Sequence, residues 1–111
     1  EKDIDAVTAL SGSGPALVYK MIEAMVEGGI RSGLKKDIAN LLAVQTALGA
    51  VKTMIQTKKA PAELIKMVAS PGGTTLAGLK TLDDNKFNDI VRDSVIAAYS
   101  RAKEIRAGFE V

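Results

Sequence analysis

The 111-residue sequence contains no cysteine, no histidine and no tryptophan, and only 4% of its residues are aromatic. Without cysteine there are no disulfides, no thiolate metal sites and no cysteine nucleophile. Without histidine the commonest zinc ligand and every Ser-His-Asp arrangement are excluded. No remaining side chain ordinarily titrates near pH 7. Chemistry by these residues therefore depends on carboxylates, hydroxyls and backbone groups, and we expect no bound metal.

Charge is nearly balanced, with 15 basic and 13 acidic residues, and the longest basic runs are the pairs Lys35-Lys36 and Lys58-Lys59. This pattern is typical of a solvated surface, so we expect no nucleic-acid partner. No continuous apolar run approaches the roughly 18 residues of a transmembrane helix, so no membrane span is expected. There is no secretory signal pattern, which favours a cytoplasmic location. The start, Glu1–Asp5, reads like the interior of a longer chain.

Apolar residues recur at helical spacing through most of the sequence, and the strict alternation of strands is absent. We expect a break at 11–15, after which Ser13 or Gly14 caps the first helix and Pro15 begins it. Gly33 is expected to cap that helix's end, and 83–85 is expected to be a turn or kink. The prediction is an all-α fold, a bundle of about five helices at 16–28, 35–59, 62–69, 74–82 and 86–107.

The segment 35–59 has almost no polar face over about five turns. A helix that is apolar nearly all round must be buried nearly all round. A single domain of this size has too few other helices to cover it. The segment therefore indicates a partner subunit.

The stretch Ser70–Thr75 places two glycines and several hydroxyls where one helix ends and the next begins. Glycines permit close approach of the backbone, and a helix N-terminus presents free N–H groups with a partial positive charge. These features suit a carboxylate or phosphate. From local chemistry alone, a tight turn with threonine caps is the stronger interpretation.

Two other candidates are weaker. Gly12-Ser13-Gly14 lacks the third glycine and the preceding strand of a dinucleotide loop, which favours a hinge and helix cap. The carboxylates Asp83, Asp84 and Asp93 could hold a metal or serve acid–base catalysis, but acids in a polar turn are usually solvated.

Two sets of residues together resemble the pyrroline-5-carboxylate reductases. The first is Asp5–Ala16, with the sequence DAVTALSGSGPA, which is similar to that family's interdomain stretch. The second runs from Pro61 through Leu64, continues over Val68–Thr75, and includes Gly78-Leu79 and Leu82-Asp83. The resemblance covers essentially the whole chain, 1–111, as the family's C-terminal helical domain. Leu17 departs from it, because the family often has an aromatic residue there.

The resemblance implies a fold like the C-terminal domain of 6-phosphogluconate dehydrogenase, interlocked in a homodimer that can assemble further. It implies an enzyme that moves a hydride from NADPH or NADH to the ring C=N of 1-pyrroline-5-carboxylate, giving L-proline in the last step of proline biosynthesis. The cofactor is held by an N-terminal Rossmann domain that this sequence lacks. We therefore expect no cofactor-binding residue in this chain and no activity from it alone.

The resemblance also assigns the site. Ser70, Gly73, Thr74 and Thr75 are expected to bind the substrate carboxylate, largely through backbone N–H groups. Thr75 is the expected catalytic residue, whose hydroxyl orients the ring nitrogen without acting as the proton source. Two alternatives remain open: the C-terminal domain of a related NAD(P)-dependent dehydrogenase, and a non-catalytic helical oligomerisation module.

Overall fold

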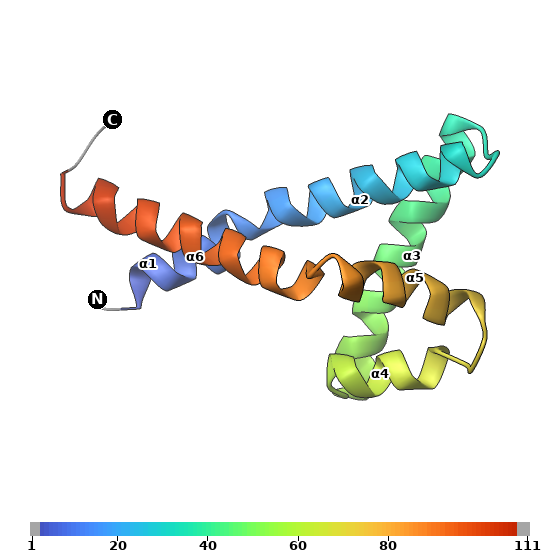
Figure 1. The fold of residues 1–111 in the computed structure, drawn as a ribbon. Helices are drawn as coiled ribbons and strands as arrows, with labels where there is room; N and C mark the ends of the chain where they lie inside the picture. The colour runs from blue at the N-terminus through green and yellow to red at the C-terminus, as the bar shows by residue number, and fades with distance from the viewer. Residues whose placement is uncertain (1–2, 109–111) are drawn as a thin grey trace. The chain divides into compact units, whose positions relative to one another are not determined.

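The structure, a computed structural model, describes residues 3–108 and is built of helices (Figure 1). No strand occurs within these residues, so the all-α prediction is confirmed. Within residues 3–108, five helices of eight residues or more follow a short helical segment. The elements in chain order are α1 Ile4–Val7, the π-helix η1 Thr8–Gly12, α2 Gly14–Arg31, α3 Lys36–Thr57, α4 Pro61–Val68, α5 Thr74–Asp84 and α6 Phe87–Arg106.

The ends of the five longer helices lie close to their predicted positions. The predicted cap of α2 is confirmed: Gly33 has φ +107°, and its N–H donates to Ile30 O at 3.0 Å. The N–H of Leu34 donates to Gly29 O at 3.0 Å. These two bonds and the positive φ form a Schellman motif, which satisfies carbonyls that the helix leaves open.

The N-terminal segment differs from the prediction of a break at 11–15. The chain is already helical from Ile4, and η1 continues this segment as a π-helix through Gly12. Only Ser13 interrupts it before α2 begins at Gly14. A four-residue helix has no readable apolar period and is marginal by itself, so its formation depends on contacts that local patterning does not reveal.

The chain divides into two compact units, one from the described parts of residues 1–18 and 80–111, the other from Tyr19–Leu79. In the second unit, α2 and α3 pack through small side chains. Val26, Ala39 and Ala43 are buried, and Ile22 packs against them. A Cβ at Gly29 would lie 3.3 Å from Ala39 Cβ, so a larger residue would separate the two helices.

Helix α3 leaves most of its apolar surface uncovered by its own chain. Only Ala39 and Ala43 are buried along its length. Its exposed large apolar residues are Ile38, Leu41, Leu42, Val44, Leu48, Val51, Met54 and Ile55. By length and composition alone, Lys36–Thr57 is apolar enough to cross a membrane, although it contains no continuous apolar run of that length. The same composition is found in helices buried between protein subunits.

In the other unit, α1 and η1 contact α6 (Figure 1). Ala9 is fully buried, and Asp5 is only 4% exposed. The Asp5 carboxylate accepts hydrogen bonds from Arg106 Nε at 3.0 Å to each oxygen, and from Arg106 Nη2 at 2.8 Å. These residues stand 101 positions apart. The pair therefore ties the first helix of the described chain to the end of the last.

The hydrogen bonds from Arg106 hold the pKa of the Asp5 carboxyl below its ordinary value of 3.8. Burial opposes this shift, and the positive charges of Arg106 and Lys103 add to it. Because the folded state lowers this pKa, the stabilisation is fully present above the unfolded pKa and is lost as the pH falls toward the folded value.

We predict that Asp5→Asn lowers the melting temperature at pH 7, and that the gap to the wild type stays constant down to about pH 5 and narrows below it. Thermal melts from pH 3 to 8 measure the gap. Asp84→Asn, which breaks the exposed Lys80–Asp84 pair (2.7 Å), is the control and should change the melting temperature little. A gap that does not depend on pH would contradict the prediction.

Candidate functional site

The turn Ser70–Thr75 joins α4 to α5 and holds all four residues assigned to the site by resemblance. Pro61 begins α4, where its missing N–H has no intrahelical partner to lose. Gly72 has φ +72°, a conformation that favours glycine. The N–H of Gly73 donates to Ser70 O at 3.1 Å and closes the turn. The structure thus brings Ser70 and Gly73 into direct contact at the start of α5.

Gly73 lies so close to Ser70 that a side chain at Gly73 would force Ser70 to shift. A Cβ at Gly73 would lie 2.8 Å from Ser70 Oγ and 3.2 Å from Ser70 O. Glycine at position 73 is therefore favoured by the close approach of Ser70 and not by its backbone angle, because its φ is not in the positive region.

Thr74 and Thr75 are the first two residues of α5. Among residues 3–108, no acceptor outside the helix is found for the N–H groups of Thr74, Thr75 or Leu76. The helix itself cannot satisfy them, because its first N–H groups have no carbonyl one turn earlier. Thr74 is exposed and Thr75 is half-buried. The turn therefore presents N–H donors at the positive end of a helix, an arrangement that suits a carboxylate.

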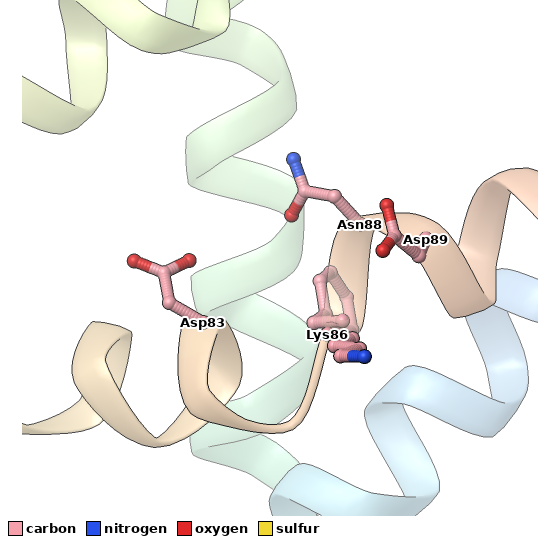
Figure 2. Close-up of a pocket in the computed structure, with 5 residues that line it drawn as sticks. Asp83, Lys86, Asn88 and Asp89 are labelled. Carbon is pink, nitrogen blue, oxygen red and sulfur yellow. The ribbon is translucent and has the colours of Figure 1, made fainter.

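The acidic residues near α6 do not converge on a common point. A pocket of about 170 Å³ is lined by Asp83, Lys86, Phe87, Asn88 and Asp89. Figure 2 shows its polar side chains spread around the turn between α5 and α6. Asp84 pairs with Lys80 at 2.7 Å, and Asp93 pairs with Arg92 at 3.1 Å.

Within residues 3–108, no group of three or more acidic side chains could hold a metal ion. The pairing of Asp84 and Asp93 with neighbouring cations favours the solvated interpretation of these carboxylates.

The Gly12-Ser13-Gly14 stretch does not form a nucleotide loop. Gly12 ends η1, Gly14 begins α2, and a helix precedes them where a dinucleotide fold requires a strand. Ala16 N donates to Ser13 O at 3.1 Å, as expected at a helix start. The interpretation as a helix cap is supported. The Gly12-Ser13-Gly14 stretch therefore does not fit a dinucleotide cofactor.

Sequence reasoning missed the Asp5–Arg106 pair, although Asp5 belongs to the first motif. The sequence near Asp5 or Arg106 does not indicate this contact, because two residues so far apart in the chain produce no recognisable spacing. The only available hint was Asp5 itself, an acidic residue ahead of an apolar stretch.

The geometry defines an all-helical domain. One of its helices has an uncovered apolar surface, and a glycine turn lies at the start of another. The sequence matches the family described as pyrroline-5-carboxylate reductase dimerisation over residues 1–105. The chain belongs to this family.

Individual relatives give the same result. The chain is 47% identical over 105 residues to the pyrroline-5-carboxylate reductase of Glycine max, covering 95% of this chain and 38% of that protein. It is 43% identical over 109 residues to pyrroline-5-carboxylate reductase 2 of Bacillus subtilis, covering 98% and 39%. The chain therefore spans about two-fifths of the length of the curated relatives it matches.

Solved structures confirm the fold. The reductase of Plasmodium falciparum, solved with NADP bound, has a TM-score of 0.89 and 38% identity, over 93% of this chain and 39% of that chain. The enzyme from Streptococcus pyogenes has a TM-score of 0.91 and 36% identity, over 94% and 40%.

We predict that Gly73→Ala lowers the free energy of unfolding by about 1–3 kcal/mol, because the new Cβ overpacks the turn. The double variant Ser70→Ala/Gly73→Ala should recover part of this loss, since it removes the 2.8 Å contact and leaves the one at 3.2 Å. Denaturant unfolding measures the free energy of unfolding of both variants.

Gly78→Ala is the matched control, because a Cβ at Gly78 meets nothing within 4 Å. Inside α5 it should stabilise the chain by up to about 1 kcal/mol. Equal stability of the Gly73 and Gly78 variants would show that the close approach at Gly73 has no energetic consequence.

Proposed function

We propose that residues 1–111 are the dimerisation and substrate-binding domain of a pyrroline-5-carboxylate reductase, which reduces the ring C=N of 1-pyrroline-5-carboxylate to give L-proline. The observation that carries the proposal is the family match over residues 1–105. The glycine turn between α4 and α5 supports it, because this turn suits the carboxylate that the substrate carries.

The turn binds the substrate carboxylate. The N–H groups of Thr74 and Thr75 donate to its oxygens at the positive end of α5, and the hydroxyl of Ser70 assists. Gly73 allows the backbone to approach the ligand, while its own N–H closes the turn onto Ser70 O. Charge-assisted hydrogen bonds of this kind contribute roughly 1.5–3 kcal/mol each.

Thr75 acts as the orienting group. Its hydroxyl oxygen accepts a hydrogen bond from the protonated ring nitrogen and so fixes the direction of the ring carbon to be reduced. A threonine hydroxyl is too weak an acid to protonate that nitrogen fully, but an iminium nitrogen can arrive already protonated. The hydride is supplied by NADPH or NADH, held by a part of the protein outside these residues. The gain in rate from this chain is therefore positional.

The uncovered surface of α3 is proposed to be the dimer interface, with assembly of dimers into larger oligomers as a further step. Exposed apolar residues along α3 continue onto α4, where Ile65, Met67 and Val68 are exposed. A hollow of about 360 Å³ between these helices is lined almost entirely by apolar atoms. Association with a second copy removes this surface from water, which is favourable in proportion to its area.

A cytoplasmic location, without a nucleic-acid or membrane partner, accompanies this proposal. The two alternatives predict different behaviour. A non-catalytic oligomerisation module binds neither L-proline nor a ring carboxylate at Ser70–Thr75. A domain from another NAD(P)-dependent dehydrogenase gives an enzyme that leaves 1-pyrroline-5-carboxylate unreduced.

We predict that Thr75→Ala in the full-length protein lowers kcat/KM for 1-pyrroline-5-carboxylate about 10-fold or more, because a hydrogen bond to the charged ring nitrogen is lost. Thr75→Ser, which keeps the hydroxyl, should retain most of the activity. Substrate-dependent oxidation of NADPH measures the reaction. Unchanged kinetics in Thr75→Ala would remove Thr75 from the proposed mechanism.

We predict that the melting temperature of this chain rises with protein concentration, since a dimer of folded chains is favoured by mass action. Leu48→Glu should abolish this dependence, because it places a charge in an apolar interface. Gln45→Glu introduces the same charge at a polar position of α3 and is the matched control. A concentration-independent melting temperature for the unmodified chain would contradict an α3 dimer interface.

A further inference from the structure

Asp5 is the one buried polar residue among those the structure describes. Its side chain is 6% exposed. Arg106, the last residue of α6, donates three hydrogen bonds of 2.8–3.0 Å to its carboxylate. Such a fork-shaped arrangement fixes direction as well as distance, because the planar guanidinium meets both carboxylate oxygens.

The Asp5–Arg106 pair stabilises the segment of α1 and η1, which is not stable by itself. Helix α1 has four residues and η1 has five, both too short to be stable without tertiary contacts. Among residues 3–12, only Asp5 and Ala9 are buried, and the elements that carry them, α1 and η1, both contact α6. The direction of the chain at Asp3 therefore depends on these two side chains.

We propose that the Asp5–Arg106 pair is a positioning device, which fixes the direction in which the polypeptide preceding Asp3 joins the helical domain. This inference rests on the proposed function, in which the nucleotide-holding part of the reductase precedes these residues. Hydride transfer requires the donor and acceptor carbons in near-attack geometry, and an error of about 1 Å can lower the rate about 100-fold. Asp5 and Arg106 touch no reacting atom and act through the junction they hold.

The test uses the full-length protein, with Asp5→Asn and Arg106→Lys compared with the unmodified enzyme well below its melting temperature. The lysine keeps the charge at position 106 but cannot form the fork. Hydrogen exchange reports on residues 4–12 and on the rest of the chain separately. Steady-state kinetics give kcat and the KM for the pyrroline substrate. Glu104→Gln, which breaks the exposed Arg101–Glu104 pair (3.0 Å) on the same helix, is the matched control.

The expected result for Asp5→Asn is loss of exchange protection confined to residues 4–12 and a fall in kcat of about 10-fold, with less than a twofold change in KM. Arg106→Lys should give smaller losses of exchange protection and of kcat than Asp5→Asn, and Glu104→Gln should change neither. Loss of protection without a change in kcat would overturn the proposal, as would unchanged protection at residues 4–12.

If Asp5→Asn does not fold, Arg106→Lys alone decides. Protection lost throughout the chain in that variant, with kcat and KM changing together, would show a general structural role and overturn the proposal. A wrong proposed function gives a different result: the unmodified protein would then show no pyrroline-dependent NADPH oxidation. The exchange experiment reports on the pair in either case.

Discussion

The uncovered apolar surface of α3 is the constraint on which the rest of the structure depends. Along Lys36–Thr57 only two alanines are buried, whereas leucines, valines and isoleucines face outward. Fully burying an aliphatic side chain of this size, relative to leaving it exposed, contributes about 1.5–3 kcal/mol, and these side chains are only partly buried. A helix of this composition is stable as part of a larger apolar interior, and a second copy of the chain is the partner that the dimerisation family indicates.

The packing of the second unit is consistent with this constraint. Its few buried residues, Val26, Ala39 and Ala43, form too small a core to make α3 self-sufficient. The proposed substrate turn follows α4, which contributes to the same apolar surface as α3. Association and substrate binding are therefore linked in the proposed function, because the proposed interface covers the elements that carry the turn. In the proposed function a cofactor held by another part of the protein supplies the hydride, so a chain without histidine or cysteine can serve an enzyme.

Helix periodicity and punctuation predicted much of the fold. The helices α2–α6 were predicted within a few residues, and the role of Gly33 followed from its place after a periodic segment. The α4–α5 turn was also predicted, since its glycines and threonines mark the boundary between two helices. These features are local, and local physics determines them.

The sequence did not reveal what depends on distant contacts. Helix α1 and η1 are too short for a readable period, and they form against α6, roughly a hundred residues away along the chain. The Asp5–Arg106 pair joins the same two regions, so no spacing rule could identify it. At the site, sequence reasoning proposed Ser70 and Gly73 by resemblance, but the contact between them became visible only in the folded turn.

Sedimentation equilibrium of the unmodified chain at micromolar concentration tests the central claim most directly. If a second copy covers α3, the measured mass is at least twice the 11.6 kDa of one chain. A single species of 11.6 kDa across the concentration range would contradict the account, because the apolar surface of α3 would then be stable in water without a second copy.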